Sequence, residues 1–477
     1  MSPRHFHAEY AWLDQGWHRD VRFEIDGGRY LAGALLDVGP DDHTQPSEPL
    51  GRWVLPGIPN LHSHAFQRAM AGLAERRGDP QDSFWTWREV MYAFAGRVGP
   101  DELRAIASQL YVEMLKAGYT QVCEFHYLHH QPDGRPYADP AQMSLALIDA
   151  AQEAGIGLTL LPTLYMTGGF DGRVLGERQH RFGHDIDAFL RLVERLRMLE
   201  HPRLRIGIAL HSLRAVPEDA MAAVLDGLAS LPPSGSGVPA SVMPIHIHIA
   251  EQIGEVQDCL AIRNARPVEW LLDHAPVDSR WTLIHATHVD AQEVRRLAAS
   301  RAVVGLCPTT EANLGDGLFP LKEWLDAGGD IGIGSDSHIS VSPVEELRWL
   351  EYGQRLVTRH RNVSATHEQP STGSRLFADA LRGGARAARM PVGSLVGGDS
   401  TLPSVGNRAD LLVLDETSAL LAGRDQESVL DTWIFAGNSN LVRHVMVNGD
   451  WAVRDFQHRE EARIAARYRA VVAKLRR

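Results

Sequence analysis

The chain has 477 residues, of which 44% are hydrophobic and 23% are charged, a composition typical of a globular protein. Its formal net charge of −12 argues against nucleic acid or an anionic membrane surface as the main partner. The N-terminus lacks a basic-then-apolar signal layout and no apolar run reaches about 18 residues, so we expect a cytoplasmic protein without a membrane span. Three widely spaced cysteines without a CxxC pair indicate reduced thiols.

Both ends of the chain consist of short apolar runs separated by turns. From about residue 5 to 55 the runs alternate around an Asp-Gly-Gly turn at 26–28, which indicates small antiparallel strands. The tail has the same pattern, and the Val-Asn-Gly-Asp stretch at 447–450 predicts a hairpin turn. A helix is expected over 460–477.

Between these ends, apolar β-rich runs alternate with amphipathic segments at regular spacing. Such alternation is typical of a parallel sheet that is buried on both faces. Eight such units predict an α/β fold, a (β/α)8 TIM-type barrel over residues 56–399. The expected strands are WVLPGIPN (53–60), TQVCEF (120–125), IGLTLLPTL (156–164), LRIGIALHS (204–212), MPIHIHIAE (243–251), WTLIHATH (281–288), AVVGLCPTT (302–310) and DIGIGSDSH (330–338).

Six polar residues lie at the C-terminal ends of these predicted strands or just beyond them. That end of a TIM barrel is its catalytic face. The residues are His62, His64, His211, His248, His285 and Asp336.

Four of the six predict a metal site. Residues i and i+2 of a strand point to the same side, so His62 and His64 can bind one ion. His248 follows strand 5, and Asp336 follows strand 8, which neighbours strand 1 in a closed barrel. Three imidazoles and a carboxylate suit zinc, although iron or manganese could use the same ligands. The alternative is a set of ordinary hydrogen-bonded polar groups. His246 lies deeper in strand 5 and is expected to be a packed group rather than a ligand.

Two further residues are candidates for proton handling. Glu251 follows His248 by three residues and can reach both a metal-bound water and a substrate; its alternative role is a surface or capping carboxylate. His285 can polarise or protonate the group under attack; its alternatives are a fifth ligand or a core histidine. In the mechanism we expect, Asp336 accepts the proton of the attacking water.

The stretches HSH (62–64), HIAE (248–251), LIHATH (283–288) and GSDSH (334–338) resemble the amidohydrolase superfamily, in its deaminase branch. The resemblance covers nearly the whole chain. It implies a small β-sandwich domain built from residues 1–55 and 400–477, including the final helix, and it suggests a homodimer. It also implies one ion, and strand 4 ends in His211 rather than in a lysine that could bridge two metals. The ligands it implies are His62, His64, His248 and Asp336, with Glu251 and His285 beside them.

Within the superfamily, HSHAFQRAMAG, FWTWRE, EFHYLHH and ALHSLRAV resemble the enzymes that hydrolyse the formimino group of N-formimidoyl-L-glutamate. Those enzymes release ammonia and N-formyl-L-glutamate in L-histidine degradation. The substrate contacts that this resemblance implies are Gln67, Arg88, Tyr127, His211 and Arg214.

The chemistry of such a substrate agrees with these residues. It carries two carboxylates and a cationic amidine, and planar guanidinium groups bind carboxylates through two parallel hydrogen bonds. Arg88 and Arg214 follow strands 1 and 4, so both are placed at the barrel mouth, although a surface role for Arg88 alone is an equal alternative. Tyr127 could add a phenol donor. Packing within a loop is the role expected for His126, His129 and His130.

Two other interpretations of the chain stay open. The first is another deaminase of the same branch, acting on guanine, another purine or a triazine, whose site would use stacking aromatics and amide groups rather than two guanidiniums. The second is a barrel that has lost its chemistry and serves as a binding subunit. The complete donor set, with Glu251 and His285, argues against the second.

Overall fold

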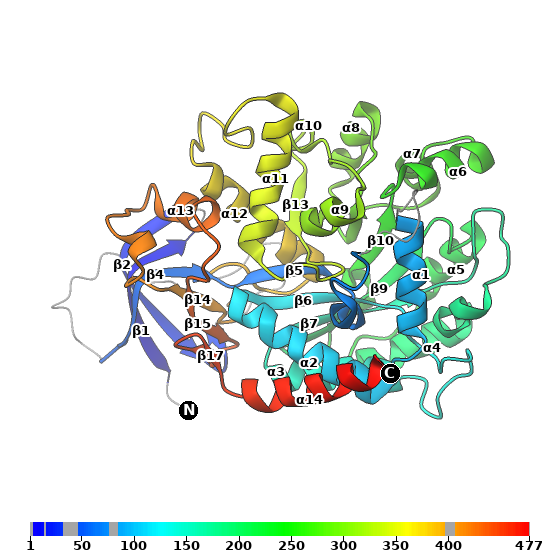
Figure 1. Ribbon diagram of the computed structural model, residues 1–477, viewed down its shortest axis with the longest axis horizontal. Coiled ribbons are helices and arrows are strands. Elements are labelled where there is room, and N and C mark those ends of the chain that lie inside the picture. Colours follow the sequence, from blue (N-terminus) through cyan, green and yellow to red (C-terminus); the bar gives the residue numbers. More distant parts are fainter. Residues whose placement is uncertain (1–2, 14–15, 32–45, 76–83, 396–405, 477) are drawn as a thin grey trace.

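The computed structural model describes residues 3–13, 16–31, 46–75, 84–395 and 406–476. Two sheets organise these residues. One is a parallel barrel surrounded by helices, and the other lies at one end of the molecule and combines the first strands of the chain with the last (Figure 1).

The barrel confirms the predicted fold class. Its strands run in parallel in the order β13-β12-β11-β10-β9-β7-β6-β5, and a short strand, β8, pairs beside β7. A parallel bridge between Ser63 and Asp336 brings the two ends of this order together. The strands are β5 (Ile58–Ser63), β6 (Tyr119–His126), β7 (Gly157–Leu164), β8 (Leu204–Ile206), β9 (Ile208–Ser212), β10 (Ile245–Ile249), β11 (Trp281–His285), β12 (Val303–Leu306) and β13 (Asp330–Ile333).

Helices cover the outside of the barrel, as the amphipathic segments predict. In α8, for example, the Asp290 side chain accepts the backbone N–H groups of Gln292 and Glu293 and so caps the helix. The α-helices are α1 (Phe84–Ala95), α2 (Pro100–Ala117), α3 (Gln142–Ala154), α4 (Ile186–Arg197), α5 (Glu218–Ala229), α6 (Ile253–Arg263), α7 (Pro267–His274), α8 (Ala291–Ser300), α9 (Pro308–Leu314), α10 (Leu321–Asp326), α11 (Pro343–Thr358), α12 (Thr372–Ala388), α13 (Val429–Phe435) and α14 (Glu461–Leu475). The 3-10 helices are η1 (Ala65–Met70), η2 (Glu177–Phe182), η3 (Ala240–Val242) and η4 (Ala419–Leu421).

The second sheet has eight strands in the order β17-β16-β15-β14-β4-β1-β2-β3, which is consistent with the expected small β-sandwich. The predicted hairpin at 447–450 is confirmed, with Asn448 and Gly449 both at positive φ (52° and 79°) between β15 and β16. The strands are β1 (Arg4–Leu13), β2 (Gly16–Asp26), β3 (Arg29–Tyr30), β4 (Glu48–Pro56), β14 (Leu411–Leu414), β15 (Val442–Val447), β16 (Asp450–Arg454) and β17 (Gln457–His458).

The first predicted barrel strand, WVLPGIPN, is wrong as a single strand. Its first half belongs to β4, which pairs with β1 and β14, and its second half begins β5. The chain crosses between the sheets at Gly57. A Cβ atom there would lie 2.2 Å from the Thr120 hydroxyl, so only glycine fits this crossing.

A buried ion pair ties the two sheets together at the same place. Arg408 donates to Asp410 (2.5 Å) and also to the side-chain oxygen of Gln121 (2.8 Å) in β6. The carbonyl of Asp410 accepts the backbone N–H of Gly57. The terminal sheet is thus anchored directly to the barrel.

The final helix, α14, lies against the barrel helix α2 (Figure 1). Lys116 at the end of α2 pairs with Glu461 at 2.5 Å, and the Leu475 carbonyl accepts from Arg97. The division of the chain into domains at 55/56 and 399/400 stays a prediction, and its second boundary lies outside the described residues.

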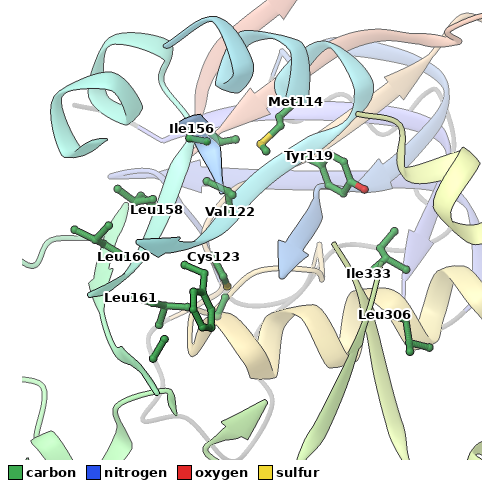
Figure 2. Packing of buried hydrophobic residues seen from close by; sticks show 14 of the residues in the cluster. Met114, Tyr119, Val122, Cys123, Ile156, Leu158, Leu160, Leu161, Leu306 and Ile333 are labelled. Carbon is green, nitrogen blue, oxygen red and sulfur yellow. The ribbon is translucent and has the colours of Figure 1, made fainter. Parts of the chain in front are cut away.

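Apolar residues from the strands and the surrounding helices form one large cluster, and two smaller clusters lie beside it. Figure 2 shows part of it, where Met114 of α2 gathers with side chains of β6 and β7 such as Val122 and Leu158. No helix within the described ranges combines the length and apolarity needed to cross a bilayer. Because apolar side chains fill the interior, the polar side chains at the barrel mouth are the candidates for a functional site.

Candidate active site

His62, His64 and Asp336 meet where the barrel closes. The Asp336 backbone N–H donates to the His62 carbonyl (3.0 Å), and the His64 N–H donates to the Asp336 carbonyl (3.1 Å). Oδ1 of Asp336 lies 3.3 Å from Nε2 of His62 and 3.4 Å from Nε2 of His64. Both imidazoles therefore reach one carboxylate, as their i, i+2 spacing predicts.

His248, near the end of β10, joins the same point. Its Nε2 lies 3.0 Å from Nε2 of His62 and 3.3 Å from Nε2 of His64. Nδ1 of His248 faces the His211 carbonyl (3.1 Å), and Nδ1 of His64 faces the Phe125 carbonyl (2.9 Å). Because a carbonyl only accepts, both rings carry their proton on Nδ1 and direct an Nε2 lone pair toward the centre.

This donor set fits a divalent cation. The four separations, 3.0 to 3.4 Å, resemble the ~3.3 Å between neighbouring ligands of a tetrahedral zinc ion with bonds of 2.0–2.1 Å. Burial lowers the pKa of all three histidines, so protonation does not relieve the repulsion between their lone pairs and the carboxylate. A positive ion at the centre would relieve it.

The backbone at the barrel mouth is strained. Ala250, His285 and Asp336 have φ values of 50°, 69° and 44°, in the left-handed region that residues other than glycine rarely adopt. Each lies at the end of a barrel strand or just beyond it, at or beside a candidate site residue. Such strain costs about 1–3 kcal/mol per residue and concentrates at functional sites.

Glu251 and His285 lie beside the donor set. Nε2 of His285 is 3.7 Å from both Glu251 Oε1 and Asp336 Oδ2, and its Nδ1 is 3.2 Å from Glu311 Oε1. Burial raises the pKa of Glu251 to about 7. Burial lowers the pKa of His285, but Glu251 and the hydrogen bond with Glu311 outweigh it and raise the value to about 10. The arrangement therefore holds a carboxyl group that can give and take a proton near neutral pH, beside an imidazole that stays protonated there.

All five expected substrate contacts line the pocket that contains these residues. The Gln67 amide donates to the Tyr127 hydroxyl (2.9 Å), and Nδ1 of His211 faces the Ser212 hydroxyl (3.1 Å). Among the described residues, no carboxylate oxygen lies within 4 Å of the Arg214 guanidinium. The contacts are Gln67, Arg88, Tyr127, His211 and Arg214.

Other histidines lie apart from this pocket. Nε2 of His246 faces the Ala387 carbonyl (3.0 Å) and does not join the donor set. The rings of His126, His129 and His130 pack in one cluster with that of His184, with centroids 4.4 to 5.0 Å apart between neighbours.

The sequence patterns missed several residues that support the site. Glu311 lies in α9, the short helix that follows β12, and its place beyond a predicted strand is the only sequence signal for it. Glu124 lies within β6, and the apolar residues around it in the sequence give no sign of a functional role. Tyr165, directly after β7, lines the pocket, and Gln179 of the short helix η2 donates to its hydroxyl; no strand or helix pattern in the sequence locates this contact.

A barrel with a candidate His/Asp metal site at its C-terminal mouth defines the class of metal-dependent barrel hydrolases. Residues 53–452 match the model of the amidohydrolase family, and the chain belongs to that family. Residues 4–48 match the N-terminal domain of formimidoylglutamate deiminase HutF.

Relatives agree with this membership. The chain is 52% identical over 469 residues to formimidoylglutamate deiminase of Pseudomonas aeruginosa, covering 98% of each chain. A 5-methylthioadenosine/S-adenosylhomocysteine deaminase of Natronomonas pharaonis is 26% identical, over 91% of this chain and 88% of its own. The crystal structure of an amidohydrolase from Brucella melitensis superposes with a TM-score of 0.89 and 44% identity, covering 99% of this chain and 100% of the other.

Proposed function

We propose that this protein is a formimidoylglutamate deiminase, which hydrolyses N-formimidoyl-L-glutamate to N-formyl-L-glutamate and ammonia in L-histidine degradation. The observation that carries the proposal is the 52% identity with the Pseudomonas aeruginosa enzyme over 98% of both chains. The pocket supports it, because it places two guanidinium groups and a metal donor set in one cavity. The purine deaminases among the relatives are only about half as similar.

The metal is proposed to be held by the four convergent donors at the barrel mouth. Zinc is our first assignment, since three imidazoles and one carboxylate suit it. A bound ion would supply Lewis-acid activation of the attacking water. The proposed ligands are His62, His64, His248 and Asp336.

Proton transfers are assigned to two side chains, and charge stabilisation is assigned to a third. Asp336 accepts a proton from the water while the oxygen of that water adds to the amidine carbon. Glu251 delivers protons to the nitrogen that leaves as ammonia, and its pKa of about 7 suits a group that must both take and release a proton at neutral pH. His285 stabilises the negative charge that grows on the attacking oxygen.

The glutamate part of the substrate is assigned to the other side of the pocket. Arg88 and Arg214 bind its carboxylates, and Gln67, Tyr127 and His211 complete its surroundings. Arg214 is suited to this role because it is desolvated and has no close carboxylate partner among the described residues. Fixing the carboxylates holds the reacting carbon beside the metal donors.

The setting of the enzyme is also proposed. A cytoplasmic location is supported by three buried free cysteines, since reduced thiols are typical of that compartment. The family resemblance suggests a homodimer, and light scattering on the purified protein tests it: a mass of one chain, 52.7 kDa, would exclude it.

The proposed domains are a barrel of 56–399 and a terminal domain of 1–55 and 400–477. The packing of α14 on α2, however, favours counting that helix with the barrel.

An ammonia-release assay tests the activity. N-formimidoyl-L-glutamate, guanine and adenosine are offered to the purified protein, with and without a chelator. Ammonia from formimidoylglutamate alone, lost with the chelator and restored by zinc, is the expected result. Turnover of a purine in preference would favour the alternative deaminase, and no turnover with a metal-free protein would favour a binding subunit.

A further inference from the structure

Two phenols line one wall of the pocket and an amide donates to both of them, and none of the three has a role in the assignments above. Tyr92 lies on α1, Tyr165 follows β7 directly, and Gln179 lies in η2. The Gln179 amide donates to the Tyr165 hydroxyl at 2.8 Å and to the Tyr92 hydroxyl at 3.3 Å. Both tyrosines line the pocket and are buried, with 3% and 8% of Tyr165 and Tyr92 exposed.

The direction of these hydrogen bonds is determined by Gly176. Its backbone N–H donates to the Gln179 side-chain oxygen at 3.0 Å, so the amide NH2 group must face the phenols. Each phenol oxygen therefore already accepts a hydrogen bond, and its own proton is available to be donated. The two hydroxyls also form a hydrogen bond with each other, in which one of the two phenol protons is donated. The other proton remains for a ligand.

The position of the phenols relates them to the anionic end of a substrate. The Tyr165 ring lies 4.4 Å from the His211 ring, which lies 5.2 Å from the ring of His248. Tyr165 is thus separated from the metal donors by one intervening ring. It is also close enough to Arg88 and Arg214 for both guanidiniums to act on it electrostatically.

Burial keeps this hydroxyl in its protonated form, because desolvation raises the pKa of Tyr165 well above neutral pH. The Cζ atom of Arg88 lies 5.5 Å from the centre of the Tyr92 ring, so the cation and the second phenol share one face of the pocket. A neutral O–H donor near two cations suits a carboxylate and offers nothing to a cationic amidine.

We propose that Tyr92 and Tyr165, oriented by Gln179, are specificity-determining residues that bind the side-chain carboxylate of the substrate. This inference rests on the proposed function and deepens it. The phenols distinguish formimino derivatives of dicarboxylic amino acids from those with a single carboxylate, because a buried donor that loses its acceptor weakens binding of the shorter compound. Gln179 is a positioning residue that acts through the two hydroxyls.

The experiment compares two substrates in the full-length, metal-loaded enzyme. N-formimidoyl-L-glutamate has the side-chain carboxylate, and N-formimidoylglycine lacks it. We expect Tyr165→Phe to lower kcat/KM for the first about 10-fold, mainly through KM, because hydrogen bonds to charged groups are worth about that factor. For formimidoylglycine we expect no change, so the preference for the dicarboxylate falls by the same factor.

Variants of Gln179 separate positioning from simple packing. Gln179→Leu should reduce the same preference, and Gln179→Glu should reduce it further, since a carboxylate would accept the phenol protons and repel the substrate. Tyr352→Phe, at an exposed tyrosine of α11 that does not line the pocket, is the matched control. Should Tyr165→Phe fail to fold, as judged by its melting temperature, the two Gln179 variants provide the same comparison.

The outcomes distinguish this inference from the proposed function. Equal losses for both substrates, or no loss for either, in an enzyme active on formimidoylglutamate would overturn the role of the phenols and leave the activity standing. A wild-type enzyme inactive on formimidoylglutamate would overturn both. A selective loss for the dicarboxylate supports both.

Discussion

Glu124 and Ser63 face each other across β6 and β5, and the Ser63 hydroxyl donates to the Glu124 carboxylate at 2.6 Å. The same carboxylate accepts the backbone N–H of Ala65 at 2.6 Å. Glu124 thus holds the chain on both sides of His64. Ser63 also lies 3.2 Å from Nε2 of His338, two residues beyond Asp336. One buried network therefore supports the two segments that carry three of the four candidate ligands, His62, His64 and Asp336.

Replacing Glu124 by alanine is expected to weaken metal binding while leaving the ligands themselves in place. Outer partners of metal ligands are typically worth 10–100-fold in affinity. Competition with a chromogenic zinc chelator measures this, and Glu323→Ala on the outer helix α10 is the control. Unchanged zinc affinity in the Glu124 variant would contradict a supporting role.

Glu251→Gln is expected to keep its metal and lose most of its turnover. The amide has nearly the same shape but cannot transfer protons, and loss of such a group typically costs about 10²–10⁴-fold. Ammonia release and metal content are measured on the same sample, with Glu323→Gln as the control. Wild-type turnover at full metal occupancy would exclude Glu251 as the proton shuttle.

Arg214→Met is expected to raise KM about 10-fold or more with a smaller effect on kcat. The thioether retains much of the length of the side chain but cannot make the charge-assisted hydrogen bonds that a carboxylate receives. Saturation curves with N-formimidoyl-L-glutamate check this, and Arg214→Lys should lose less. A KM equal to that of the wild type would rule out a carboxylate contact at Arg214.

Metal removal is expected to lower the melting temperature. Without a cation, lone pairs of three histidines and a carboxylate face one another at 3.0 to 3.4 Å. A ligand at 100 times its Kd stabilises the folded state by about 2.7 kcal/mol. Calorimetry of chelated and zinc-reloaded protein measures the shift. Identical melting temperatures would show that these residues hold no ion in the folded protein.

The histidine cluster outside the pocket predicts acid sensitivity. Burial, reinforced by His130, lowers the pKa of His184 to about 3, against about 6.5 when unfolded. Below about pH 6.5 the unfolded chain binds a proton that the folded chain does not, so stability falls as the pH falls, by up to ~1.4 kcal/mol per pH unit. His184→Gln should flatten this loss. Urea midpoints between about pH 7 and 5 measure it, and parallel wild-type and variant curves would refute the assignment.

The barrel and the residues at its mouth could be predicted because both depend on local patterns. Buried strands show as apolar runs, and the polar residue that ends each run marks the mouth. The break at Gly57 could not be predicted, since it depends on β14 pairing with β4 from the other end of the chain. The contacts of Glu124 and Gln179 could not be predicted either. The partners of both residues lie on other elements of the fold, and no local sequence pattern shows which elements meet.

The position of β4 between β1 and β14 has a consequence for how the protein is made. β4 leaves the ribosome about 350 residues before its second partner, so one edge of the terminal sheet stays open while the whole barrel is synthesised. The first fifty or so residues therefore cannot complete their sheet alone. During synthesis the barrel is able to form first. The C-terminal strands then complete the terminal sheet by pairing with the N-terminal segment, which was synthesised first.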